Sequence, residues 1–97
     1  MECQEAIGLL KRHEADLRRL GVEHLYLFGS TARDEAQPDS DVDLFFDHPE
    51  GSMGLFGLMD VQAVAAHILG RKVDVMTRRS LHPALRSQIE ATSVMVF

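Results

Sequence analysis

Two aspartates, Asp41 and Asp43, are separated by a single valine in the segment Ser40–Leu44. Side chains of a β-strand alternate between its two faces, so a strand here would place both carboxylates on one face and close together. Two like charges so close raise each other's pKa unless a cation lies between them. Carboxylate oxygens are hard ligands that suit Mg²⁺, which commonly takes one or two of them together with waters and substrate phosphates. The pair therefore predicts a magnesium site that acts on phosphates.

The turn that follows the apolar run Leu25–Phe28 has the residues of a phosphate-binding segment. Gly29 lets the backbone come close to a ligand, and the start of the helical turn that follows Ser30 would offer free N–H groups to phosphate oxygens. Arg33, one turn later, would add positive charge to this segment, or it would pair with a neighbouring acidic residue on the surface. Two other ligand-binding loops are excluded, because no Gly-Lys-Ser/Thr follows as in a P-loop and Leu44 stands where an EF-hand requires glycine.

A third aspartate, Asp74, stands between two valines in the segment Lys72–Thr77, which is rich in β-branched residues. A buried charge without a partner at mid-strand would be costly, so we expect this side chain to point toward Asp41 and Asp43, provided that the two strands are neighbours. Three carboxylates could then hold two cations about 3.5–4 Å apart, an arrangement that supports in-line displacement at a phosphate. The simpler alternative is a structural carboxylate that bonds to the backbone.

Helices and strands that would position these residues alternate along the chain. The first half is predicted to hold a helix over 3–20, a strand over 25–28, a helical turn or two within 31–36 and a strand over 41–47. The second half is predicted to hold a helix over 55–69, a strand over 72–77, a helix over 82–91 and a last strand within 94–97. The long helices show apolar residues near a 3.6 period and end at Gly21 and Gly70. The strand over 41–47 would direct Phe45 to the face of the aspartates, and Leu85 and Ile89 would belong to the apolar stripe of the last helix. The alternation predicts one α/β domain over residues 1–97, a small mixed sheet packed with helices.

The charge of the chain is concentrated in the segment that carries the aspartate pair. Fifteen acidic residues against ten basic ones give a net charge of −5, and seven of the acids fall within residues 34–50, which contain no Lys or Arg. Phosphate-backbone binding needs basic surface, so we do not expect nucleic acid as a stable partner. The sequence contains no run of about 18 apolar residues, so it predicts no membrane span. The single cysteine, Cys3, cannot form an internal disulfide, which fits a cytoplasmic protein.

The combined spacing of these motifs resembles a known signature. Gly29-Ser30, followed after ten residues by Asp41-Val42-Asp43, resembles the pattern of the polymerase-β-like nucleotidyltransferase superfamily. The short chain and the later segment Arg71–Met76 are similar to its minimal nucleotidyltransferase (MNT) branch. The resemblance covers nearly the whole chain and is strongest from Leu25 to Asp47.

The resemblance implies a role for each candidate residue. Asp41 and Asp43 would hold Mg²⁺ on the phosphates of a nucleoside triphosphate, and Asp74 would hold a second metal ion and help to deprotonate the attacking hydroxyl. The triphosphate would be bound by the turn that precedes the aspartate pair: Gly29, Ser30 and Arg33.

The resemblance also implies an activity and a partner. The enzyme would transfer a nucleoside monophosphate, expected to be AMP from ATP, to a hydroxyl. MNT proteins are often paired with a helical HEPN protein in toxin–antitoxin modules, in which the MNT protein is the antitoxin and modifies a tyrosine of the toxin. Two alternatives stay open: a non-catalytic module that neutralises a HEPN toxin by contact, and nucleotidyl transfer to RNA or to a small molecule.

Overall fold

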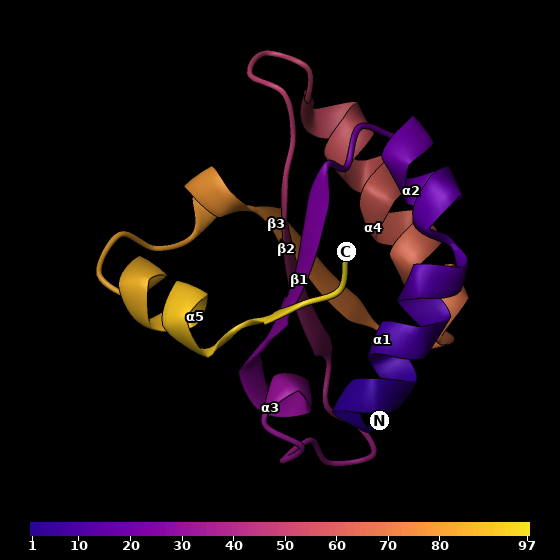
Figure 1. Cartoon of the computed structure of the whole chain (residues 1–97), viewed down its shortest axis with the longest axis vertical. Coiled ribbons are helices and arrows are strands. Elements are labelled where there is room, and N and C mark those ends of the chain that lie inside the picture. Colours follow the sequence, from indigo (N-terminus) through magenta and orange to yellow (C-terminus); the bar gives the residue numbers. More distant parts are fainter.

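The computed structural model describes residues 1–97 and shows the expected alternation of helices and strands (Figure 1). In chain order the elements are α1 (Cys3–Arg12), α2 (Glu14–Arg19), β1 (His24–Phe28), α3 (Gly29–Ala32), β2 (Val42–Asp47), α4 (Leu55–Leu69), β3 (Val73–Thr77), the 3₁₀ turn η1 (Arg78–Ser80), α5 (Arg86–Thr92) and β4 (Val94–Met95).

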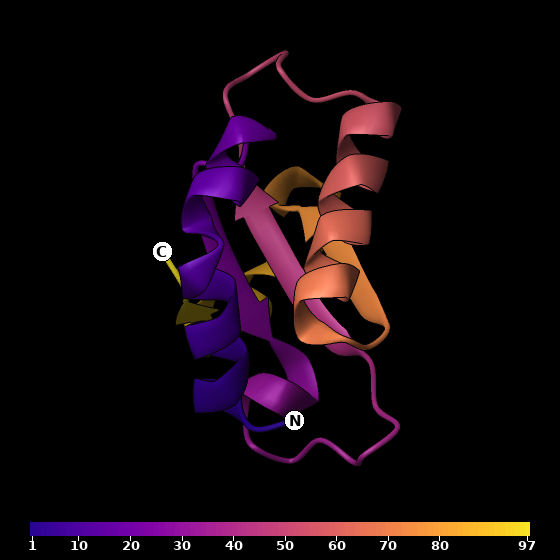
Figure 2. The ribbon, with the colours of Figure 1, turned by 90° about the vertical axis from the view of Figure 1, so that its right-hand side faces the viewer.

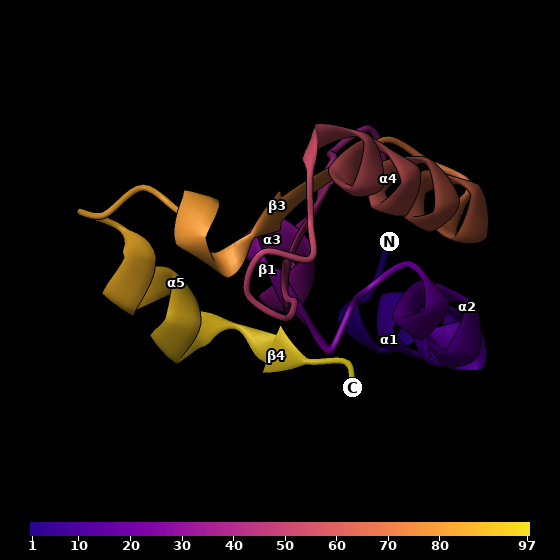
Figure 3. The same ribbon diagram turned by 90° about the horizontal axis from the view of Figure 1, so that it is seen from above.

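The four strands form one mixed sheet in the order β3-β2-β1-β4. β1 is antiparallel to both of its neighbours, whereas β2 and β3 are parallel and are connected through α4. Helices α1 and α4 lie over one face of the sheet, and α5 lies on the other side (Figures 2 and 3). The prediction of a small mixed sheet packed with helices is therefore confirmed.

The core lies between the sheet and the layer of α1 and α4. Alternate residues of β1, β2 and β3 point into it, so the period-2 pattern of the sequence matches the faces of the sheet. The strand residues of this core are Leu25 and Leu27 of β1, Val42, Leu44 and Phe46 of β2, and Val73 and Val75 of β3; Ala6 and Leu10 of α1 and Val61, Ala65 and Leu69 of α4 cover them. Phe45 is turned to the opposite face, as expected, where it stacks on Tyr26.

The single helix predicted over 3–20 is wrong, because the helix is interrupted at His13. In an uninterrupted helix the carbonyl of Leu9 would accept the backbone N–H of His13. The ring Nδ1 of His13 donates to that carbonyl instead (3.0 Å), and the backbone N–H of His13 turns to Leu10 O (3.1 Å). This side-chain bond ends α1 at Arg12, and α2 begins at Glu14.

The prediction for the last helix is also partly wrong. Residues 82–85 form a turn in which the N–H of Ala84 donates to the His82 ring (3.1 Å), so α5 begins only at Arg86. Leu85 is exposed instead of contributing to an apolar stripe, and α5 buries none of its residues. In contrast, α4 has the predicted bounds and ends at Gly70, whose φ of +65° is left-handed. None of the helices combines the length and the apolar character that crossing a membrane requires.

Candidate active site

The sheet places Asp43 directly beside Asp74. Asp43 of β2 pairs with Asp74 of the parallel strand β3 on one side and with Phe28 of β1 on the other. Paired residues of adjacent strands project to the same face, and such strands lie about 4.8 Å apart. The condition that the sequence analysis set for a shared site, neighbouring strands, is therefore met.

Asp41 lies one residue before β2 and not within it, which corrects the predicted start of this strand. β2 begins where its neighbour begins, since Val42 pairs with Val73 and the N–H of Val42 donates to Lys72 O (3.2 Å). Asp41 therefore has no ladder partner. Its carboxylate Oδ2 is 3.9 Å from Nζ of Lys72, an exposed and loose ion pair.

The three carboxylates are coupled electrostatically. The pKa of Asp43 is raised above its ordinary value, first because the side chain is partly buried, then because of the negative charges of Asp74 and Asp41; the charge of Arg33 partly offsets this. Asp43 thus lies at the centre of a group of like charges, within range of one cationic side chain. Such an excess of carboxylate on one face is an environment that a cation would stabilise.

Asp74 differs from its prediction in one respect. It is exposed, not buried, because β3 is an edge strand with only β2 beside it. The cost of an isolated buried charge therefore does not explain why an aspartate stands between two buried valines. Its position as the neighbour of Asp43 on an accessible edge is what makes it available to a ligand.

The donor set fits Mg²⁺ by chemistry, although the carboxylates do not converge into a complete cage. As the side chains lie, no three of the His, Cys, Asp and Glu side chains form a group that could hold a metal ion. Mg²⁺ needs only one or two protein carboxylates when substrate phosphates and waters supply the other ligands. Binding of Mg²⁺ by Asp41, Asp43 and Asp74 stays a prediction.

Gly29 brings the backbone against the carboxylate of Asp43. Its φ of +73° lies in the left-handed region, and a Cβ atom at this position would be 2.3 Å from Oδ2 of Asp43. No other residue fits here without displacing Asp43. The helical turn α3 starts at Gly29, two residues earlier than predicted, so Ser30 and Thr31 lie within it.

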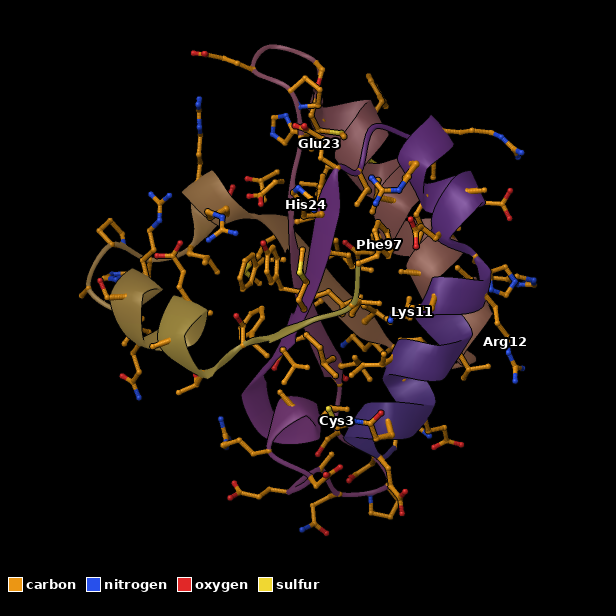
Figure 4. The ribbon with its side chains drawn as sticks, viewed as in Figure 1. Cys3, Lys11, Arg12, Glu23, His24 and Phe97 are labelled. Atoms are coloured by element: carbon orange, nitrogen blue, oxygen red, sulfur yellow. The ribbon has the colours of Figure 1, made fainter.

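The turn that begins at Gly29 is held in place by the start of α1. The N–H of Cys3 donates to Oδ1 of Asp34 (2.7 Å), and Asp34 itself has a φ of +57°. Figure 4 shows Cys3 at the end of α1 that faces α3. Burial, and secondly the charge of Asp34, raise the pKa of the Cys3 thiol. Thr31, to which the sequence analysis gave no role, is buried here, and its hydroxyl has no hydrogen-bond partner.

Arg33 pairs with an acidic residue on the surface, which was one of the two arrangements predicted for it from the sequence. Its Nε donates to Oε2 of Glu35 (3.0 Å), and both side chains are exposed. The pairing does not remove its influence on Asp43, whose pKa it lowers. A role of Gly29, Ser30 and Arg33 in nucleotide binding stays a prediction.

A second cluster on the same face was not foreseen from the sequence. Arg78 lies 4.8 Å from the ring centroid of Tyr26 and 5.1 Å from that of Phe45. Its Nε and Nη2 donate to the two carboxylate oxygens of Asp47 (2.6 and 3.0 Å), and its Nη1 donates to Glu90. These bonds raise the pKa of Arg78. They connect β2, the turn after β3 and α5 on the face of the sheet that carries Asp43.

We expect Asp43→Asn to unfold at a higher urea concentration than the wild type near pH 7 in EDTA. The pKa of Asp43 lies above 3.8 in the folded state, so folding favours the protonated form and wild-type stability falls as the pH rises from 3.8 through the raised pKa. Asparagine cannot ionise, so this part of the pH dependence should disappear. Asp39→Asn, an exposed neighbour, serves as the control and should keep the wild-type profile. Identical pH profiles for all three proteins would contradict the coupling.

A family model described as nucleotidyltransferase domain matches residues 10–95 of the chain. The protein adenylyltransferase MntA of Thermococcus cleftensis is 32% identical over 90 residues, which is 92% of this chain and 90% of that relative. A Methanocaldococcus jannaschii protein classed with the protein adenylyltransferases is 37% identical over 81 residues, 81% of this chain and 86% of the relative.

Solved structures agree with these relatives. One described as a minimal nucleotidyltransferase superposes with a TM-score of 0.76 at 30% identity and covers 97% of this chain and 95% of its own. A toxin–antitoxin structure with AMP-PNP has a TM-score of 0.72 at 20% identity, covers 90% of this chain and 72% of its own, and shows the likeness of fold alone. With the family match over most of its length and with MntA among its relatives, the chain belongs to the nucleotidyltransferase domain family, on the minimal nucleotidyltransferase branch that the spacing of its motifs resembles.

Proposed function

We propose that this nucleotidyltransferase transfers AMP from ATP to a tyrosine hydroxyl of a HEPN-domain protein, and thereby acts as the antitoxin of a toxin–antitoxin pair. The observation that carries the proposal is the strand register, which sets Asp43 beside Asp74 on an open face while Gly29 brings the backbone against Asp43. The name of the Thermococcus cleftensis relative supports protein adenylylation. A structure of an MNT antitoxin with a tri-AMPylated HEPN toxin of Shewanella oneidensis, 19% identical with a TM-score of 0.67, suggests the class of partner.

Asp41 and Asp43, joined by Asp74, would hold the magnesium ions. When bound, Mg²⁺ neutralises phosphate charge and draws electron density from the α-phosphorus. Backbone N–H groups of the turn at Gly29 and Ser30 would bind the triphosphate oxygens. The exposed carboxylate of Asp74 would accept the proton of the acceptor hydroxyl. The acceptor oxygen then forms a bond to the α-phosphorus as the bond from that phosphorus to the bridging oxygen breaks, and pyrophosphate leaves.

Transfer of label tests the proposal. The chain is incubated with ATP labelled at the α-phosphate, Mg²⁺ and a HEPN-domain protein. We expect label on the HEPN protein with the wild type, and a rate at least about 100-fold lower for Asp43→Asn or Asp41→Asn, since each change removes a carboxylate that would hold the Mg²⁺ by which phosphate charge is neutralised. Asp39→Asn, which changes the net charge equally, should retain the wild-type rate.

The same experiment separates the enzyme from the non-catalytic alternative. If the chain neutralises the toxicity of the HEPN protein without labelling it, and Asp43→Asn neutralises it equally well, contact alone is sufficient and the proposal is wrong. Label on RNA or on a small molecule in place of the HEPN protein would retain the chemistry but overturn the choice of acceptor.

A further inference from the structure

A small pocket lies at the far end of β2 and β3 from the candidate active site. It has a volume of about 160 Å³ and is formed where β2 ends, η1 follows β3 and α5 begins. Among its seven lining residues one is hydrophobic and three are arginines, Arg78, Arg79 and Arg86, with Asp47 as the one acidic member. A concentration of guanidinium groups in one depression stands out in a chain whose net charge is −5.

The three arginines of this pocket differ in how their donors are used. Arg78 is engaged by both oxygens of Asp47 and by Glu90. Arg79 and Arg86 have only distant partners: the carboxylates of Glu50 and Glu90 lie 3.9 and 3.7 Å away, and neither guanidinium donates a hydrogen bond to the protein. Two arginines therefore line one pocket while their guanidinium groups donate no hydrogen bond within the chain.

The neighbouring acids neutralise this pair only in part. The carboxylate of Asp47 is held by Arg78, and Glu90 is shared between Arg78 and Arg86. Glu50 does not line the pocket and its side chain is 84% exposed, so its contact with Arg79 is easily exchanged for another anion. The three arginines set against Asp47 and Glu90 leave one net positive charge at the pocket, and the planar donor forks of Arg79 and Arg86 match the oxygens of a phosphate group.

We infer that the pocket between Arg79 and Arg86 is a binding site for a phosphate group, distinct from the site that would hold the triphosphate. His48 and Thr77 line the same pocket and carry further polar atoms. Asp47, at its wall, is four residues beyond Asp43 on β2, which is about 13 Å at 3.3 Å per residue. A triphosphate bound beside Asp43 does not extend so far, so the ligand is a second phosphate, either free or carried as a phosphate ester.

The inference is tested by NMR titration of the ¹⁵N-labelled full chain with inorganic phosphate, and separately with AMP, in EDTA at constant ionic strength. We expect saturable shifts of the His48, Thr77, Arg79 and Arg86 signals. The double variant Arg79→Gln/Arg86→Gln should bind at least about tenfold more weakly, as expected when two charge-assisted contacts are lost. Arg79→Gln alone, at a side chain 71% exposed, should fold as the wild type does and bind several-fold more weakly.

Arg19→Gln is the matched control, because Arg19 is 75% exposed and pairs with Asp16 on α2, away from the pocket. If it weakens phosphate binding as much as the pocket variants do, the effect is one of net charge and the inference is wrong. In the titration with inorganic phosphate, shifts centred on Gly29 and Ser30, or unchanged binding by the double variant, would also overturn it. Tighter binding of AMP than of phosphate, measured on the signals of Arg79 and Arg86, would identify a phosphate ester as the ligand of this pocket, and equal binding would identify free phosphate.

The result is independent of the proposed function. Asp43→Asn should bind phosphate in this pocket as the wild type does, even though the proposed transfer requires Asp43. Failure of adenylyl transfer with intact phosphate binding would therefore overturn only the proposed function, and the reverse result would overturn only the second phosphate site.

Discussion

Gly29→Ala should abolish adenylyl transfer and also destabilise the fold. A Cβ atom at residue 29 would lie 2.3 Å from Oδ2 and 3.2 Å from Cγ of Asp43, so the carboxylate must move away from its place beside Asp74. A displacement of about 1 Å at a reacting centre can lower a rate about 100-fold, and we expect at least this loss in the label-transfer assay. The left-handed φ of +73° adds a backbone cost of about 1–2 kcal/mol, measurable by urea unfolding.

Gly51→Ala distinguishes the effect of the steric clash with Asp43 from the effect of backbone strain. Gly51 has nearly the same φ, +75°, but no atom lies within 4 Å of the position of its Cβ. We therefore expect a comparable loss of stability, about 1–2 kcal/mol, with wild-type transfer activity. If Gly29→Ala is as active as Gly51→Ala, the contact between Gly29 and Asp43 does not set the catalytic geometry.

Local patterns predicted the parts of the fold that local forces determine. The bounds of α4 followed from apolar periodicity and from Gly70, and the two faces of β2 followed from alternation. The break at His13 was missed because it depends on one side-chain bond to the Leu9 carbonyl, which no periodicity encodes. The exposure of Asp74 was missed for a different reason, since a Val-Asp-Val segment reads the same in a central strand and in an edge strand.

The candidate site was predictable to the extent that its residues are close in the sequence or share a strand face. Asp41, Asp43 and the turn at Gly29 lie within 15 residues of one another. The closeness of Asp74 to this pair could be predicted only on the condition that the strand of Asp74 is the neighbour of β2, which it is. The interactions of Arg78 could not be predicted. Its partner Asp47 is 31 residues away, and such a pairing is set by the register of β2 and β3, which single-sequence patterns do not specify.

Arg78→Gln should cause the largest loss of stability among single changes of charged residues. The change leaves Asp47 and Glu90 without their main partner and removes the cation from above Tyr26 and Phe45. Breaking a buried ion pair costs about 3–5 kcal/mol; because Arg78 is 25% exposed, we expect about 2–3 kcal/mol. For a chain of this size 1 kcal/mol corresponds to about 4–8 °C in Tm, so calorimetry would resolve the change readily.

The stability of Arg78→Lys should lie between that of Arg78→Gln and that of the wild type, because an ammonium group retains the charge but cannot engage both oxygens of Asp47 at once. Arg19→Gln, which breaks an exposed pair with Asp16, should cost no more than about 1 kcal/mol. A loss for Arg78→Gln as small as that for Arg19→Gln would show that the cluster contributes geometry without stability.

The loss of structure in Arg78→Gln should begin in α5 before the rest of the chain unfolds. α5 buries none of its residues, so its attachment to the sheet depends strongly on the hydrogen bond that Glu90 accepts from Arg78. In Arg78→Gln we therefore expect hydrogen exchange to accelerate in α5 first, while the amides of β1 and β2, which pair over five residues, retain their protection. Glu90→Gln should release α5 in the same way without exposing Asp47. Uniform acceleration throughout the chain in both variants would instead show that α5 and the sheet unfold as one cooperative unit.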